Sequence, residues 1–177
     1  MSQPIESSAG FAPIAAANAR TLILGSLPGR RSLAAAEYYA HRQNAFWPIM
    51  AALFGVGGSY ESRCEQLTRE GMAVWDVLAN SVRPGSMDAD IHLDTAVPND
   101  FSEFLSEHAD VKRICFNGRK AEQLFEKLVI PKLTTPLPEL ISLPSTSPAY
   151  AKMSFNDKLD DWASKLAIEP LTARRTL

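Results

Sequence analysis

The residues best suited to chemistry in this chain lie between Leu22 and Trp47. An apolar run at 22–24 is followed by Gly-Ser-Leu-Pro-Gly, and then by a cluster of polar and aromatic side chains. A loop with glycine at both ends allows backbone N–H groups to approach a ligand closely. The alternative is a strand-to-helix turn that binds nothing. The cluster favours a site, and its members are Tyr38, Tyr39, His41, Asn44, Phe46 and Trp47.

The side chains available for this chemistry are amides, hydroxyls and aromatic rings. Asn44 offers a carbonyl oxygen and two N–H donors, and a later Ser/Pro loop offers the hydroxyls of Ser145, Thr146 and Ser147. The chain has neither a nucleophile elbow, nor a Walker lysine after the glycine loop, nor a GxGxxG motif. Nucleotide phosphoryl transfer and dinucleotide redox chemistry are therefore disfavoured. The set suits a flat heterocycle that stacks on a ring while loops hold its backbone.

Composition and charge restrict the class of protein. The chain has 177 residues, which predicts one domain over 1–177, with loose tails at 1–12 and 170–177. Its net charge of −2 argues against binding nucleic acid through bulk positive charge, although a focused site remains open. Two distant cysteines and three scattered histidines predict no metal or iron–sulfur centre. The absence of a long apolar run or a signal peptide predicts a cytoplasmic protein without membrane contact.

The elements that must position these residues alternate along the chain. Apolar runs predict strands at 22–25, 72–78, 111–116 and 139–143, with helices between them and a long polar loop over 79–94. Ser32, Asn44 and Asn99 are expected to cap helices, and Ser154 with Asp157 predicts a capping box before the last one. This order indicates an α/β fold, a four-stranded, mostly parallel sheet with helices on both faces.

The predicted sheet explains how distant residues meet. The segments after its four strands read GSLPG, DVLANS, FNG and LPSTSPAY. In a parallel sheet all four emerge at the same edge, where open α/β folds bind their ligands. We therefore expect their polar groups to line one cleft.

Three motifs together resemble the uracil-DNA glycosylase superfamily: GSLPG, then YYAHRQNAFW, then LPSTSPA. The resemblance is strongest to its hypoxanthine-DNA (deoxyinosine) glycosylase branch, and PSTSPA is also similar to the PSSSA-type loop of mismatch-specific enzymes. It covers nearly the whole chain. It implies a three-layer α/β/α domain that hydrolyses the bond between an altered base and deoxyribose without a metal or cofactor.

The chain departs from the classical members at two motifs. Ser26 and Leu27 stand where classical and mismatch enzymes carry a water-activating Asp or Asn. The resemblance to the hypoxanthine branch implies that this role moves to Asn44. Leu143 replaces the histidine that precedes the last loop in classical enzymes, which argues against strong uracil activity.

Catalytic roles follow for two residues. Asn44 is expected to hold the attacking water, with helix capping as the alternative or additional role. Because a side-chain amide is a poor base, the mechanism is expected to be dissociative, with an oxocarbenium-like sugar. His41 is a candidate for protonating the leaving group, with a structural hydrogen bond as the alternative.

Binding roles divide between the base and the DNA backbone. Phe46 is expected to stack on the flipped base, or else to be a core residue, and Asp76 to read the base edge, or else to be a loop carboxylate. Asn117 is expected in the pocket or in an Asn-Gly turn. The predicted base-binding set is Gly25, Ser26, Tyr39, Phe46, Asp76 and Asn117. The predicted DNA-binding set is Arg30, Ser145, Thr146, Ser147, Tyr150 and Lys152.

The sequence thus predicts a monofunctional glycosylase of base excision repair whose partner is DNA carrying deaminated bases. Hypoxanthine is expected first, with xanthine and uracil as further substrates. We expect a monomer without a cofactor. The alternatives are a mismatch-specific uracil/thymine glycosylase, a non-catalytic nucleic-acid-binding module on the same fold, and a hydrolase of small molecules.

Overall fold

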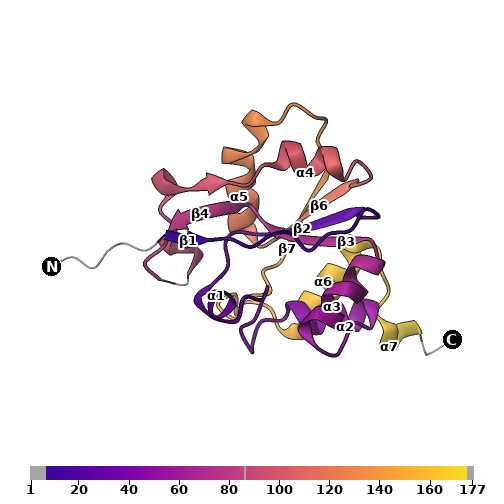
Figure 1. Ribbon diagram of the computed structural model, residues 1–177. Coiled ribbons are helices and arrows are strands. Elements are labelled where there is room, and N and C mark those ends of the chain that lie inside the picture. Colours follow the sequence, from indigo (N-terminus) through magenta and orange to yellow (C-terminus); the bar gives the residue numbers. More distant parts are fainter. Residues whose placement is uncertain (1–6, 86, 175–177) are drawn as a thin grey trace.

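A computed structural model describes residues 7–85 and 87–174 and contains a four-stranded parallel sheet at its centre (Figure 1). The strands are β2 (Thr21–Gly25), β3 (Met72–Asp76), β6 (Arg113–Asn117) and β7 (Glu139–Leu143), in the order β3-β2-β6-β7. Ile23 is in register with Val74 on one side and Cys115 on the other. The strand and sheet predictions are confirmed.

Helices cover both faces of this sheet, as a three-layer α/β/α fold requires (Figure 1). One face carries α4 (Phe101–Glu107) and α5 (Arg119–Leu128), followed by a short turn, η3 (Ile130–Lys132). The other carries α1 (Arg30–Ala35), α2 (Phe46–Phe54), α3 (Tyr60–Arg69) and α6 (Phe155–Leu166). None of the helices described over 7–85 and 87–174 is long and apolar enough to cross a membrane.

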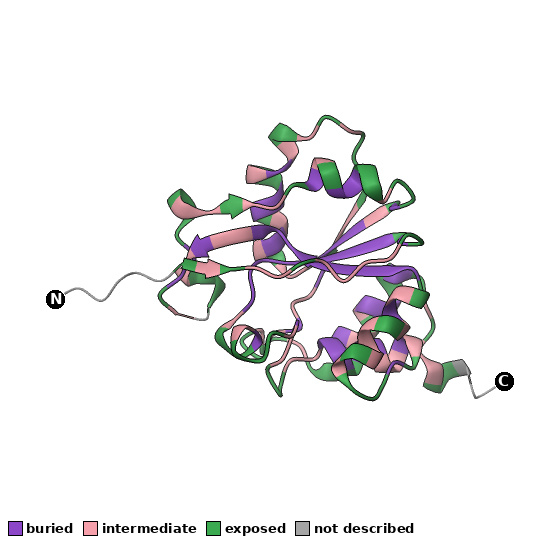
Figure 2. Cartoon of the chain, viewed as in Figure 1, coloured by how far each residue is buried: buried purple, intermediate pink, exposed green. Residues whose placement is uncertain are grey.

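The core lies where the inner helix faces meet the sheet, and burial is densest there (Figure 2). Every residue of β2 and β3 is buried, because both faces of these two strands are covered. Phe46 from α2 and Trp162 from α6 are fully buried on one face, and Phe101 and Phe125 meet edge to face on the other. The sheet therefore holds its carboxyl edge rigidly.

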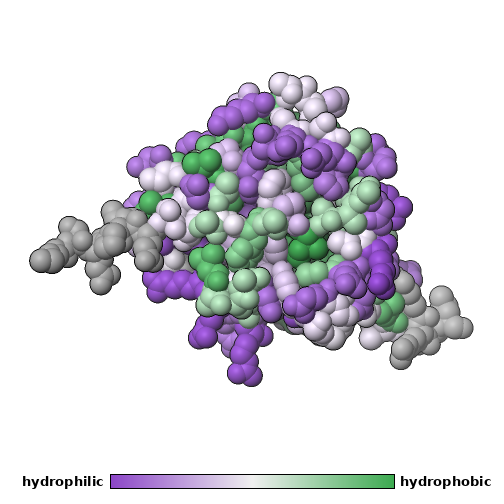
Figure 3. Space-filling view, viewed as in Figure 1, coloured by the Kyte–Doolittle hydropathy of each residue, from purple (hydrophilic) through white to green (hydrophobic). Residues whose placement is uncertain are grey.

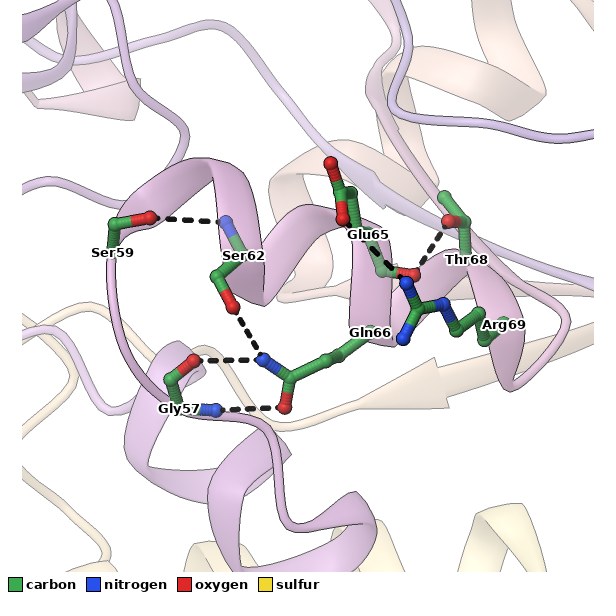
Figure 4. A network of polar contacts seen from close by, with 7 residues as sticks. All are labelled: Gly57, Ser59, Ser62, Glu65, Gln66, Thr68 and Arg69. Atoms are coloured by element: carbon green, nitrogen blue, oxygen red, sulfur yellow. Dashed lines mark hydrogen bonds and ion pairs between the residues drawn. The ribbon is translucent and has the colours of Figure 1, made fainter.

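Local hydrogen bonds fix the beginning of α3 (Figure 4). The Ser59 hydroxyl caps the helix by accepting from the Ser62 N–H at 3.2 Å. One turn later, the Gln66 amide donates to the Gly57 carbonyl at 2.8 Å and accepts from the Gly57 N–H at 3.2 Å. These hydrogen bonds tie the α2–α3 connection to the first turns of α3. Gly71 (φ 76°) lies between the end of α3 and β3.

A second, antiparallel sheet replaces part of the predicted loop at 79–94. It has the order β1-β4-β5, from β1 (Ser7–Ala9), β4 (Leu78–Val82) and β5 (Val97–Pro98). Two single turns, η1 (Asp88–Asp90) and η2 (Leu93–Thr95), connect β4 to β5. The sequence did not reveal this sheet because β4, with the sequence LANSV, has no continuous apolar run and its partners are only three and two residues long. Val77 alone separates β3 from β4.

The expected loose tails are also corrected within the described residues. Residues 7–9 form β1, and residues 171–174 form α7 (Leu171–Arg174), which packs near α2. Residues 1–6 and 175–177 lie outside the description.

Helix caps follow the predictions only in part. The Ser154–Asp157 capping box is present at α6. Ser32 instead lies inside α1, where its hydroxyl accepts from the Ala40 N–H. Asp100 caps α4, because the Asn99 amide donates to the Asp76 carbonyl instead.

Candidate active site

All four segments after the parallel strands converge on one cavity of about 490 Å³ at the carboxyl edge of the sheet. Its lining includes the loop 25–32, the segment 38–44, the end of β3, the end of β6 and the loop 145–150. Figure 3 shows one face of the same molecule, with hydrophilic side chains gathered at its margins around a more apolar middle. The predicted convergence is confirmed.

Asn44 lines this cavity and is half-buried. Its side-chain oxygen accepts from the Phe46 N–H at 2.9 Å, which satisfies a donor in the first turn of α2. Its amide nitrogen donates to no other residue within 7–85 and 87–174. Ala45 and not Asn44 is the N-cap of α2, so the predicted cap is displaced by one residue, and the Asn44 amide nitrogen remains for a ligand or water in the cavity.

His41 also lines the cavity, with its ring exposed. Its Nδ1 accepts from the Gln43 N–H at 3.1 Å, so a neutral ring carries its proton on Nε2. This is the structural hydrogen bond that the sequence left open as an alternative. The same bond leaves a donor at Nε2.

Tyr39 lines the cavity together with Tyr38 and Tyr150, whereas Phe46 does not, so the predicted stacking role of Phe46 is wrong. Phe46 is fully buried outside the lining, with the edges of Trp47 and Trp162 against it. The Tyr39 ring stacks on Phe46 at a centroid distance of 4.1 Å and 25° between planes, and it lines the cavity. A left-handed backbone at Tyr39, φ 56°, accompanies this placement.

Asp76 ends β3 at the floor of the cavity and is 4% exposed. Its Oδ2 has no hydrogen-bond partner. Burial and, less strongly, the nearby Asp88 carboxylate together raise the pKa of Asp76 to about 7, against the opposing effect of Arg83. Near neutral pH a substantial fraction of Asp76 is protonated and can donate as well as accept.

Gly25 leaves room for this carboxyl. A Cβ at Gly25 would lie 2.5 Å from Asp76 Oδ1 and 3.2 Å from the Tyr39 hydroxyl. The Tyr39 hydroxyl is buried without a hydrogen-bond partner, and burial together with Asp76 raises the pKa of that phenol. Three groups predicted for base binding thus meet at one point of the cavity.

Asn117 lies at the cavity, but its side-chain amide is hydrogen-bonded to the loop that follows β7. It donates to Thr146 Oγ1 at 2.9 Å and accepts from the Thr146 N–H at 2.9 Å. Thr146 is 1% exposed and anchors the loop, while it also belongs to the lining of the cavity, and its role in DNA binding stays a prediction. The Thr146 carbonyl in turn accepts from the Ala45 N–H, which ties this loop to Asn44.

The other predicted DNA-binding residues divide into two groups. Ser145, Ser147 and Tyr150 are half-buried and line the cavity, and Arg30 lines it while donating to the Pro84 carbonyl at 2.6 Å. Lys152 is exposed and lies outside the lining, so the structure does not bring it into this site.

Sequence reasoning missed Arg83 and Asp88. Arg83 is 5% exposed and donates to the carbonyls of Leu27 and Pro28. Asp88 accepts from the hydroxyl of Ser26 at 2.5 Å. Both residues lie in the stretch read as a loop, and only the pairing of β4 brings them to the cavity. No group of three His, Cys, Asp or Glu side chains in the described ranges is placed to hold a metal ion.

Known proteins with similar sequences and structures agree with this arrangement. The family model of the Uracil DNA glycosylase superfamily matches residues 12–169. The chain belongs to this superfamily. Its α/β fold with a four-stranded parallel sheet matches a solved structure described below.

Two relatives are hypoxanthine DNA glycosylases. The one from Methanosarcina acetivorans is 35% identical over 150 residues, covering 83% of this chain and 90% of the relative. The one from Methanosarcina barkeri is 36% identical over 115 residues, covering 63% and 72%. A solution NMR structure of a protein described as a uracil DNA glycosylase from M. acetivorans matches with a TM-score of 0.75 and 31% identity. It covers 90% of this chain and 96% of that one.

Proposed function

We propose that this protein is a monofunctional DNA glycosylase that hydrolyses the N-glycosidic bond of deaminated bases, hypoxanthine first. The observation that carries the proposal is the convergence of Asn44 and Tyr39, from the segment 38–44, and Asp76, from the end of β3, on one cavity. This set offers a water-holding amide, a flat aromatic face and a carboxyl at the edge of a bound base. The similarity to hypoxanthine DNA glycosylases supports the choice of base.

The geometry supports a dissociative mechanism. A flipped base would stack on the free face of Tyr39, since Phe46 occupies the other face. The protonated Asp76 carboxyl can donate to a base oxygen and so stabilise the departing base. Backbone N–H groups of the loop 25–29 add favourable dipoles, and Asn44 orients the water that adds to the oxocarbenium-like sugar.

A purely hydrolytic reaction is expected. The cavity lining contains no lysine among the described residues, so no amine is in place to form a Schiff base with the sugar. DNA strand cleavage should therefore be absent, and the product should be an intact strand with an abasic site.

The test is a panel of duplex oligonucleotides that carry deoxyinosine, deoxyxanthosine, deoxyuridine, or uracil or thymine opposite guanine. We expect excision to be fastest on deoxyinosine, with strand breakage only after alkali. Faster excision of uracil or thymine opposite guanine would establish a mismatch-specific enzyme instead. DNA binding without release of any base would refute the enzymatic proposal and favour a non-catalytic module.

A further inference from the structure

The loop 144–150 turns its backbone carbonyls toward the protein. The Pro144 carbonyl accepts from Trp162 Nε1 at 2.9 Å, and the Thr146 carbonyl accepts from the Ala45 N–H at 2.9 Å. The Ser147 carbonyl accepts twice, from the Tyr150 N–H at 3.0 Å and from Lys158 Nζ at 3.2 Å. These acceptors are therefore withdrawn from the cavity side of the loop.

The two serine hydroxyls of this loop keep their protons free. Ser145 Oγ accepts from the Ser147 N–H at 3.2 Å, and Ser147 Oγ accepts from the Ala149 N–H at 3.2 Å. A hydroxyl that already accepts can still donate its one proton to another group. The loop thus presents donors and few acceptors, which is the requirement for binding an anion.

Lys158 places a positive charge on the protein side of this loop, where its Nζ donates to the Ser147 carbonyl. It lies in the first turns of α6 and is only 5% exposed, with its Nζ also 5.5 Å from the centre of the Tyr150 ring. No carboxylate in residues 7–85 and 87–174 is within ion-pair distance of it. Burying an ammonium without a counter-charge is costly, and burial lowers the pKa of Lys158 accordingly. Its partners among the described residues are thus a carbonyl and an aromatic ring, and no carboxylate pairs with its charge.

We propose that Lys158 supplies the positive charge for one DNA backbone phosphate held by the serine hydroxyls that the sequence already predicts to bind DNA, and that this phosphate is the counter-charge that Lys158 lacks. The inference rests on the proposed function, since it assumes that DNA occupies the cavity. Lys158 lies on the protein side of the loop, where its hydrogen bond holds the Ser147 carbonyl inward. Its positive charge favours an anion on the opposite side of the loop, which faces the cavity. No residue of the predicted DNA-binding set supplies a buried charge of this kind.

The test uses a duplex with one tetrahydrofuran abasic analogue, whose binding requires no base excision. Binding is measured between about 50 and 200 mM salt, where each neutralised phosphate contributes about 0.9 to the slope of log K against log salt. We expect Lys158→Met to weaken binding roughly tenfold and to lower that slope by about 0.9. Lys158→Arg should keep the slope. Lys165→Met, on the exposed part of the same helix, should behave as the unaltered protein.

An unchanged slope for Lys158→Met would overturn the proposal, even if affinity fell, since a purely structural lysine changes affinity without changing ion release. If that variant fails to fold, the unaltered protein and Lys158→Arg are compared on duplexes with single neutral methylphosphonate linkages. One linkage next to the abasic site must then lower both the affinity and the slope, and a flat profile would refute the site. Failure of the unaltered protein to bind any duplex would refute the proposed function as well.

Discussion

A single substitution of Asn44 would disturb two features at once, because its oxygen accepts from the Phe46 N–H at the start of α2 while its side chain lines the cavity. We expect Asn44→Ala to lower the single-turnover excision rate by about 10²–10⁴-fold and to cost about 1 kcal/mol of stability. Binding to an abasic-analogue duplex should change little. Excision of deoxyinosine and thermal melting measure the two effects.

The control for Asn44 is a serine. Asn44→Ser keeps an oxygen that can accept from the Phe46 N–H, so its melting temperature should stay near that of the unaltered protein while excision is lost. If the serine variant recovers activity together with stability, Asn44 is only a helix cap.

Asp76 should make activity and stability depend on pH in the same window. Its folded-state pKa of about 7 exceeds its ordinary value of 3.8, so the folded protein retains a proton that the unfolded chain releases. Stability contributed by this group is therefore lost as pH rises from about 4 through 7. Excision should fall over the upper part of this range, since the protonated carboxyl is the donor.

Asp76→Asn removes that titration while preserving a donor. We expect its melting temperature to exceed that of the unaltered protein by more at pH 8 than at pH 5, and its excision rate to lose the fall near pH 7. Parallel pH profiles for the two proteins would show that another group controls the reaction.

Position 25 requires glycine because a side chain there would collide with its neighbours. Gly25→Ala would bring a methyl group within 2.5 Å of Asp76 Oδ1, so we expect at least a tenfold loss of excision with retained binding to an abasic-analogue duplex. Gly29→Ala is the matched control, because a Cβ there meets nothing within 4 Å. Equal effects of the two substitutions in an excision assay would contradict this account.

The roles of Tyr39 and Phe46 show a limit of reading single residues from sequence. Both lie in one aromatic cluster, and helical spacing places Phe46 on the apolar face of α2. Which ring reaches the cavity depends on the left-handed backbone at Tyr39, and nothing in a tyrosine predicts a positive φ. Asn44, by contrast, was predicted at the start of α2, where its oxygen accepts from the Phe46 N–H, and its catalytic role stays a prediction.

At the scale of elements, the pair Asn117–Thr146 joins the end of β6 to the loop after β7. We expect Thr146→Val to lose the hydrogen bond from the Asn117 amide, to cost roughly 1–3 kcal/mol and to weaken DNA binding. Thr146→Ser retains the hydroxyl and should restore both properties. Urea unfolding and binding to an abasic-analogue duplex give the two readouts, and an unaffected valine variant would refute the anchoring role.

The strands differ in how clearly their sequence patterns predict them. The runs in β2, β3 and β6 are apolar and buried, so their pattern alone predicts strands. In β1 and β4 the pattern is polar, and pairing between residues some seventy positions apart creates the strands. Arg83 and Asp88 were missed for the same reason, since their place in the cavity depends on β4.

For the whole molecule, the two edges of the sheet should differ in function. A second cavity of about 480 Å³ lies at the amino edge and is lined by residues that include Arg20 and Lys112. We expect Arg20→Ala and Lys112→Ala to leave excision and DNA affinity unchanged, whereas Arg30→Ala at the carboxyl edge should weaken binding several-fold. Anisotropy with a fluorescent duplex compares the three variants, and losses at the amino edge would mean that the DNA path is wrong.

The overall placement of the site was the most predictable property of the chain. Four loops after parallel strands must share an edge whatever their side chains are, so Asn44, Asp76 and Ser145 could be brought together from strand order alone. The distances between these side chains, their protonation states and their hydrogen bonds could not be predicted from the sequence. They depend on packing between segments that lie far apart in the chain.

The direct passage from β3 into β4, with Val77 alone between them, has an evolutionary consequence. Asp76 ends the rigid core, while Arg83 and Asp88 belong to an outer flap of residues 78–98. Descendants of this chain can exchange or remodel that flap without rebuilding the central layer. Under the proposed function, base preference can therefore diverge between lineages while Asn44, on a separate segment, is inherited unchanged.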